Sequence, residues 1–187
     1  LYDSLSTQGV EVDYLINNAG VAGSDLLQDR DWADHEAFFQ LMMLSVAKLC
    51  HLFIPAMRER GFGRVINIAS VAGRIPRAGG CNYGPSKAYL IALSEDLSLT
   101  LHGSGVRVCA LCPGYTHTDF HSTAGLQDMK DGMPEFVWYP AEVVVREGLN
   151  AVERGKPVYL SGRLYRLLDP FLQSVFTRRL FRIAARH

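Results

Sequence analysis

The strongest constraint on the fold comes from four short segments that are almost continuously apolar and rich in β-branched residues. They occupy residues 12–19, 63–70, 106–113 and 157–161. Uninterrupted apolar runs of this length are typical of parallel strands whose two faces are both covered by helices. The long stretches between them leave room for crossover helices. The pattern therefore predicts right-handed βαβ units in a parallel α/β sheet.

Helical periodicity fills most of the sequence between these strands. Apolar residues recur at three- and four-residue steps across residues 31–60 and 83–102, and a third helix over 140–154 has ordinary start and stop residues. Residues 115–140 lack a clean period, and we interpret them as a loop with short helices that forms a lid. A chain of 187 residues is long enough for one substantial core and too short for two ordinary domains.

Charge and cysteine usage narrow the function classes. Nineteen basic residues balance nineteen acidic ones, so the overall charge does not favour nucleic acid as a partner. The four cysteines, without framework-like spacing or a secretory signal, indicate a reducing, cytoplasmic location. Cys109 and Cys112 lie three apart in a strand and would point to opposite faces. We therefore expect buried core cysteines there, and we predict no metal site.

The residues that follow the predicted strands are the candidates for a ligand site, because ligands bind at the carboxyl ends of parallel strands. These positions hold Asn17-Asn18-Ala19-Gly20, Ser70 and Pro113-Gly114. After Ser70 come twelve residues and then Tyr83 and Lys87, which open the next helix. A Tyr and a Lys four apart share one helix face. The pattern predicts that Ser70, Tyr83 and Lys87 converge.

Such a group has a definite chemical use. A free phenol titrates near pH 10, and a nearby ammonium is expected to lower its pKa toward neutrality. Tyr83 could then protonate a carbonyl oxygen during reduction, or accept the proton of an alcohol during oxidation. Ser70 would hydrogen-bond the same oxygen. A hydride is beyond any side chain, so this chemistry requires a nicotinamide cofactor.

Four motifs in this order make the sequence resemble the short-chain dehydrogenase/reductase family. They are NNAG at 17–20, INIAS ending in Ser70, Tyr-x-x-x-Lys at 83–87 and PGYTHT at 113–118. Each is weak alone, and the four together are specific. The resemblance covers roughly residues 10–160. It implies a Rossmann-like doubly wound sheet, NAD or NADP as the cofactor, and hydride transfer to or from a carbonyl or secondary alcohol of a small, apolar substrate.

The resemblance also assigns roles to individual residues. Ser70, Tyr83 and Lys87 would be catalytic, and the helices 31–60 and 83–102 resemble those that pair subunits, which implies a homo-oligomer. Tyr83 and Lys87 would also contact the cofactor, with Lys87 on the nicotinamide ribose. The remaining cofactor-binding positions are Asn17, Ala19 and Gly20 beneath the cofactor, and Pro113, Gly114, Thr116 and Thr118 at the nicotinamide.

Two departures from the family pattern bear on activity. The glycine-rich phosphate loop and the residue that selects NAD or NADP are expected upstream of residue 1, so we interpret the chain as lacking the first βαβαβ half of its domain. Met42 occupies the position where the family usually has an active-site Asn. A thioether neither donates nor accepts a strong hydrogen bond. We expect the proton relay from Lys87 to be affected.

The last part of the chain has a different character. We interpret residues 1–162 as the C-terminal part of a Rossmann-like domain and 163–187 as a basic amphipathic extension. The extension holds six arginines and one acidic residue, whereas the rest has 13 basic and 18 acidic residues, a formal charge of −5. Its apolar stripe after Pro170 and adjoining arginines suit peripheral contact with an anionic membrane or docking onto another subunit.

Two function hypotheses follow from these observations. The first is an NAD(P)-dependent oxidoreductase in which Tyr83 is the acid or base. The second is a non-catalytic relative that acts as an interaction module, at a membrane through the arginine-rich tail. The presence of Ser70, Tyr83 and Lys87 favours the enzyme. Met42 and the absent phosphate loop favour the module.

Overall fold

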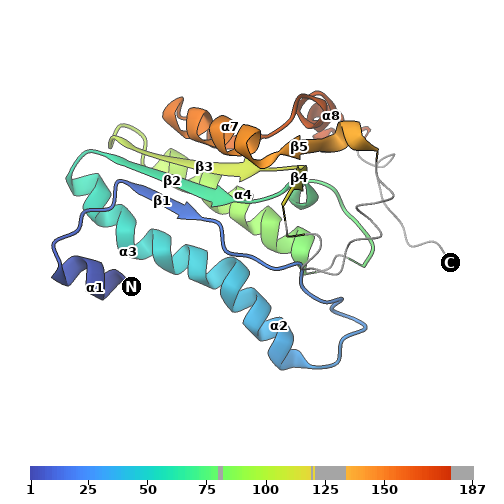
Figure 1. Cartoon of the computed structure of the whole chain (residues 1–187), viewed down its shortest axis with the longest axis horizontal. Coiled ribbons are helices and arrows are strands. Elements are labelled where there is room, and N and C mark those ends of the chain that lie inside the picture. Colours follow the sequence, from blue (N-terminus) through green and yellow to red (C-terminus); the bar gives the residue numbers. More distant parts are fainter. Residues whose placement is uncertain (80–81, 119, 121–133, 178–187) are drawn as a thin grey trace.

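The central element is a four-stranded parallel sheet (Figure 1). The computed structural model describes residues 1–79, 82–118, 120 and 134–177. The strands are β1 (Tyr14–Asn17), β2 (Gly63–Ile68), β3 (Val106–Cys112) and β6 (Val158–Leu160), in the order β1-β2-β3-β6. All four lie inside the segments that the sequence predicted as strands. The parallel α/β fold is therefore confirmed.

Helices cover both faces of this sheet (Figure 1). On one face, α3 (Ser45–Glu59) and α4 (Tyr83–Thr100) pack against alternate strand residues such as Val65 and Val108. On the other face, α7 (Ala141–Glu153) packs against Ile66 and Leu111. Burying each of these side chains contributes roughly 1.5–3 kcal/mol before entropy is counted. The alternation explains why both faces of the strands are apolar.

The two cysteines of β3 follow the same alternation. Cys109 belongs to the cluster beneath α7, and Cys112 to the cluster beneath α3 and α4. Both are fully buried free thiols. The expectation of core cysteines rather than a redox pair is confirmed.

The segment predicted as one helix over 31–60 contains an interruption. It comprises α2 (Trp32–Phe39), a π-helical turn (Gln40–Leu44) and α3. The Asp31 side chain begins α2 by accepting a hydrogen bond from the Ala33 N–H at 3.0 Å. By length and composition alone, Trp32–Glu59 could cross a membrane. Here, however, the apolar side chains of α3 pack on the sheet.

The segment 115–140 differs from its prediction at both ends. It begins with β4 (Tyr115–His117) and ends with a 3-10 turn (Glu135–Val137) and β5 (Trp138–Pro140), and β4 pairs with β5 in a small parallel sheet. The Tyr115 and Trp138 rings lie 5.1 Å apart and hold the two strands together. Short strands without alternation gave no periodic signal. Residues 121–133 lie outside the described part.

The chain is completed by two terminal helices. The first, α1 (Tyr2–Thr7), packs Tyr2 against Phe53 of α3, as expected for a helix that leads into a strand. The last, α8 (Arg163–Gln173), lies beside β5 (Figure 1). The sequence predicted a helix after Pro170, but α8 runs from 163 and includes Pro170 in its final turn. Pro170 has no N–H to donate, but its carbonyl accepts a hydrogen bond from the Ser174 N–H at 3.1 Å at the end of the helix.

Candidate active site

Ser70 lies just beyond the carboxyl end of β2. Its backbone is extended, and its hydroxyl accepts a hydrogen bond from the Ala72 N–H at 3.1 Å, which begins the 3-10 turn η2 (Val71–Gly73). The neighbouring Val71 N–H donates to the Pro113 carbonyl at 3.0 Å. The loops that follow β2 and β3 are therefore joined directly beside Ser70.

Tyr83 is the first residue of α4, and its phenol meets the Ser70 side chain. Burial raises the pKa of Tyr83, and the hydrogen bond with Ser70 partly offsets that rise. The expected net lowering of this pKa toward neutrality is wrong in this structure, because burial outweighs it and the pKa is raised. The Lys87 Nζ atom lies 5.6 Å from the centre of the Tyr83 ring, and burial dominates.

Lys87 lies one turn further along α4 and is 4% exposed. Its ammonium donates a hydrogen bond to the Ile68 carbonyl at 2.7 Å, at the end of β2. Burial lowers the pKa of Lys87 to about 8. The structure thus brings Ser70, Tyr83 and Lys87 together, as the sequence predicted, with a lysine that titrates close to neutrality.

Gly20 and Met42 form the wall on the other side of Lys87. A Cβ atom added to Gly20 would lie 3.2 Å from the Met42 sulfur and 3.8 Å from Lys87 Nζ. The Val21 N–H points at the same sulfur at 3.3 Å, and Met42 is 1% exposed. Met42 is therefore at the site, as expected from the sequence. The π-helical turn that carries it is a feature often found at functional sites.

The Asn17 side chain takes part in a buried hydrogen-bond network, and its role beneath the cofactor stays a prediction. Its side-chain Nδ2 is turned into the layer between the sheet and the helices, where it donates to Asn67 Oδ1 at 2.8 Å. Asn67 in turn donates to the Ser94 hydroxyl of α4 at 2.9 Å. Sequence reasoning missed Asn67, although a lone amide in an apolar strand was a visible signal. Asn17 Oδ1 is buried without a partner in the described residues.

The residues after β3 lie beside the Ser70 loop, and Gly114 among them packs against Tyr165 of α8. A Cβ atom on Gly114 would be 2.0 Å from the Tyr165 ring of α8, so the glycine is required by that packing. The Thr116 hydroxyl donates to the Gly114 carbonyl at 3.1 Å. Thr118 and Ala19 are exposed. The cofactor roles of Ala19, Pro113, Gly114, Thr116 and Thr118 stay predictions.

A second polar group that the sequence did not reveal holds the start of α4. The Asn82 Nδ2 donates to His35 Nδ1 at 2.8 Å and to the Ser24 carbonyl at 3.1 Å. With Nδ1 accepting, the His35 Nε2–H donates to the Asp29 carbonyl at 3.2 Å. His35 and Asn82 are both fully buried. This network fixes the backbone one residue before Tyr83.

Within the described ranges, His, Cys, Asp and Glu side chains form no group of three that could hold a metal ion. His117, in the segment interpreted as a lid, lies 3.5 Å from Glu135 and stacks near Trp138. His121 lies outside the described residues.

The fold and this site define a Rossmann-like α/β protein with a hydroxyl, a phenol and an ammonium at one edge of its sheet. A family model described as short chain dehydrogenase matches residues 1–128. The chain therefore belongs to the short-chain dehydrogenase family. This bears out the resemblance inferred from the four motifs.

Individual relatives agree with the family. The chain is 38% identical over 104 residues to the ketoacyl reductase HetN of Nostoc sp., covering 56% of this chain and 36% of that protein. It is 32% identical over 166 residues to the NADP-dependent 3-hydroxy acid dehydrogenase YdfG of Salmonella typhi, covering 80% of this chain and 67% of that protein. The matches thus span one to two thirds of these relatives.

Solved structures show the same fold. A short-chain dehydrogenase from Sphingobium yanoikuyae, determined in complex with NADPH, superposes with a TM-score of 0.75 at 27% identity. That match covers 94% of this chain and 70% of the other. The Rossmann-like interpretation of the sheet is confirmed.

Proposed function

We propose that the protein is an NAD(P)-dependent oxidoreductase that transfers a hydride between the nicotinamide and a carbonyl or secondary alcohol, with Tyr83 as the acid or base. The observation that carries this proposal is the meeting of Ser70, Tyr83 and Lys87 at the carboxyl edge of the sheet, where Ser70 bonds the phenol and Lys87 lies beneath it. Three residues with separate structural roles would not be expected to converge at this edge.

The residues present fit a nicotinamide nucleotide. Of the three N–H donors of Lys87, one is used by the Ile68 carbonyl, which leaves two for ribose hydroxyls. Gly20 keeps the wall beside that ammonium free of a side chain. Relatives of this chain include an NADP-dependent dehydrogenase and a dehydrogenase in complex with NADPH. When bound, the nicotinamide supplies or accepts the hydride.

The protein's own residues then handle the proton. Tyr83 donates its proton to the carbonyl oxygen as the hydride arrives, and Ser70 holds that oxygen by a hydrogen bond. The Lys87 ammonium stabilises the phenolate that forms. Because burial raises the pKa of Tyr83, the phenol is in its acidic form at neutral pH. That form can donate the proton that carbonyl reduction requires.

The substrate class is the finer part of the proposal. The apolar side chains at the site include Met42 and Phe120, whose ring lies 6.1 Å from the Tyr83 ring. They favour a small, apolar carbonyl compound. Relatives named ketoacyl reductase and 3-hydroxy acid dehydrogenase make β-keto esters a suitable first probe.

The test uses this chain and a version extended to the length of its relatives. NADH and NADPH are titrated by nucleotide fluorescence, and reduction of ethyl acetoacetate is followed by loss of that signal. Tyr83→Phe should retain nucleotide binding while kcat falls about 10²- to 10⁴-fold. Tyr2→Phe, which removes a hydroxyl from α1, is the control. If neither nucleotide binds either version, the protein is an interaction module instead.

Contact with an anionic membrane is a second candidate property, favoured by the outer face of α8. Leu167 and Phe171 are four residues apart and are 68% and 51% exposed, and Val175 and Phe176 beyond the helix are 83% and 91% exposed. The sequence continues with Arg178, Arg179, Arg182 and Arg186. Apolar residues next to arginines suit a helix that lies in the headgroup region.

Vesicle co-sedimentation tests this second property. The protein should bind vesicles of phosphatidylglycerol and phosphatidylcholine, and binding should weaken in salt. Replacing Leu167 and Phe171 by Asp should abolish binding, whereas Val145→Asp on α7, which is 58% exposed, should not. Binding that the double variant retains would contradict the proposal. Self-association without vesicles would assign the face to a second copy.

Two further proposals concern the setting of the protein. The exposed Leu44 and Leu99, on the helical layer formed by the π-turn, α3 and α4, support a homo-oligomer through these helices. The buried free thiols of Cys50, Cys109 and Cys112 support a reducing, cytoplasmic location.

A further inference from the structure

The inner face of α8 is fastened to the loop that carries Ser70. Asp169 of α8 forms a two-pronged pair with Arg74, with Nε to Oδ1 at 2.5 Å and Nη2 to Oδ2 at 2.7 Å. The two side chains are only 18% and 19% exposed. Gln173, one turn later, donates to the Arg74 carbonyl at 3.0 Å. Two α8 side chains therefore hold the residue that ends η2.

The position of Arg74 matters because η2 lies between α8 and the catalytic helix. A Cβ atom on Gly73 would lie 2.7 Å from the Lys87 carbonyl carbon and the Ala88 nitrogen of α4. At this distance the η2 turn cannot move any closer to α4. The Asp169–Arg74 pair fixes the same turn from the opposite side. The separation of Ser70 from Tyr83 and Lys87 is thus set from both sides.

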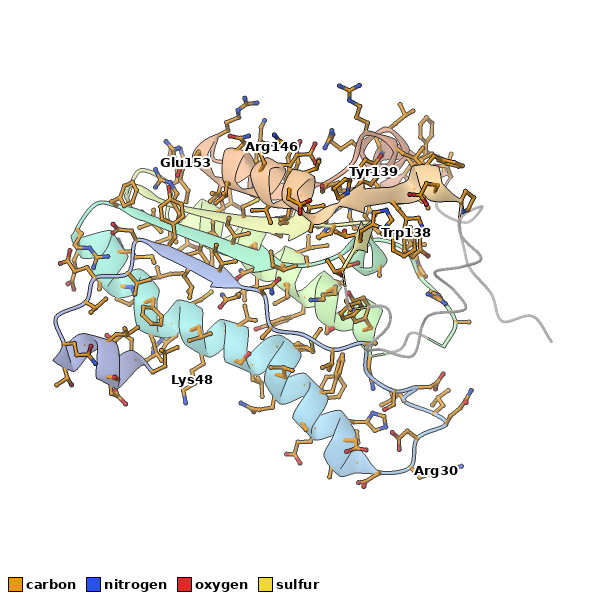
Figure 2. All side chains as sticks on the ribbon, viewed as in Figure 1. Arg30, Lys48, Trp138, Tyr139, Arg146 and Glu153 are labelled. Carbon is orange, nitrogen blue, oxygen red and sulfur yellow. The ribbon has the colours of Figure 1, made fainter. Side chains whose placement is uncertain are left out.

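Tyr165, on the same face of α8, holds the second loop of the site. Its hydroxyl accepts a hydrogen bond from the Tyr115 N–H at 3.2 Å and donates one to the Val137 carbonyl at 3.0 Å. Its ring fills the space beside Gly114. One phenol therefore connects the segment after β3 to the 3-10 turn (Glu135–Val137) that precedes β5. Tyr139 of β5, labelled in Figure 2, has its ring 6.0 Å from the Tyr165 ring.

The two fastened loops are also joined to each other, by the bond from Val71 N–H to the Pro113 carbonyl. We propose that α8 is a clasp that sets the geometry of the active site, with Tyr165 and Asp169 as positioning residues that hold the Ser70 and Pro113 loops against Tyr83. This rests on the proposed function. The family model matches residues 1–128 only, so these residues lie outside the shared motif set.

A clasp makes a specific prediction about kinetics. Misplacing a reacting group by about 1 Å can reduce the rate about 100-fold while binding is retained. Asp169→Asn breaks the charge pair with a minimal change of shape, and Tyr165→Phe removes only the hydroxyl. We expect kcat to fall about 10- to 100-fold in each, with the dissociation constant of NADPH changed by less than about threefold. Controls are Glu142→Gln, an exposed acid on α7, and Tyr2→Phe.

Amide hydrogen exchange, read residue by residue, supplies a measurement independent of turnover. In Tyr165→Phe the Tyr115 amide loses its acceptor and should exchange at least about tenfold faster, whereas the amides of β2 should be unchanged. In Asp169→Asn the faster exchange should appear at Val71 and Gly73. Exchanging the charges in Arg74→Asp with Asp169→Arg should recover part of kcat.

The outcomes separate the two proposals. Faster exchange together with lower kcat supports the clasp. If the exchange at Tyr115 and Val71 matches the wild type, or if kcat is retained while only the melting temperature falls, the clasp is refuted. A protein that never reduces a carbonyl refutes the proposed function, and in that case exchange still decides whether α8 holds these loops.

Discussion

Two buried polar side chains, Asn67 and Lys87, lie between β2 and α4, and they differ in how fully they are hydrogen-bonded. Asn67 uses both ends of its amide, toward Asn17 and Ser94, and is 0% exposed. Lys87 is 4% exposed, yet only one of its three donors has a partner among the described residues. Burial is the same, but the unused bonding capacity differs.

This difference separates a structural role from a chemical one. A satisfied amide stabilises the packing of β2 on α4 and offers nothing to a ligand. An ammonium with unused donors and a pKa lowered to about 8 can bind hydroxyls and respond to charge. The comparison predicts that substitutions at Asn67 lower the free energy of unfolding. Substitutions at or beside Lys87 should instead change the rate of the reaction and its pH dependence.

The largest expected effect is on stability, from Asn67→Ala. The variant loses two buried hydrogen bonds and leaves the Asn17 amide unpaired, so the free energy of unfolding should fall by about 3 kcal/mol. Urea unfolding measures it, and Asn150→Ala, an exposed amide on α7, is the control. For the folded fraction, kcat should stay within about twofold of the wild type. If the fully folded variant lost much of its kcat, Asn67 would have a role in the reaction and the distinction from Lys87 would not hold.

The next effect is on pH dependence and belongs to Lys87. Since its pKa is lowered to about 8, kcat/KM for carbonyl reduction should fall about tenfold per pH unit above pH 8, as the charge that stabilises phenolate is lost. A rate profile from pH 6 to 10 checks it. A flat profile through pH 9 would show that the ammonium plays no part.

The same lysine affects stability with the opposite sign. Folded Lys87 loses its proton near pH 8, whereas an unfolded lysine keeps it to about pH 10.4, so unfolding takes up a proton between these values. Stability should therefore rise with pH from about 8. Above about pH 9 the raised pKa values of Cys50, Cys109 and Cys112 reverse this trend, because unfolded thiols ionise first.

The smallest effect tests the wall beside Lys87. Met42→Asn replaces a thioether by an amide near the ammonium, which should raise the pKa of Lys87 and move the alkaline limb of the rate profile to higher pH. At pH 7, kcat should change by no more than about threefold, the equivalent of one modest hydrogen bond. Met42→Leu keeps the wall apolar and should leave the limb in place. Equal pH profiles for both variants would show that residue 42 does not affect the pKa of Lys87.

Several parts of the molecule could be predicted from the amino-acid sequence. The apolar strands, the helix that opens with Tyr83, and the convergence of Ser70, Tyr83 and Lys87 follow from local periodicity and from the rule that strand ends meet. The β4–β5 sheet was missed because three-residue strands carry no pattern. The predicted start of a helix after Pro170 was wrong, because α8 contains Pro170 and its last turn is held by the contacts of Asp169 and Gln173 with Arg74, which local sequence does not reveal.

The sequence by itself determined the parallel α/β fold and the convergence of Ser70, Tyr83 and Lys87, because apolar period and residue order are local properties. Only the tertiary structure decided their electrostatics. Burial, which depends on what packs around a residue, raises the pKa of Tyr83 and lowers that of Lys87. It also decided the place of α8, since Asp169 is 95 residues from Arg74 in the chain and no periodicity links them.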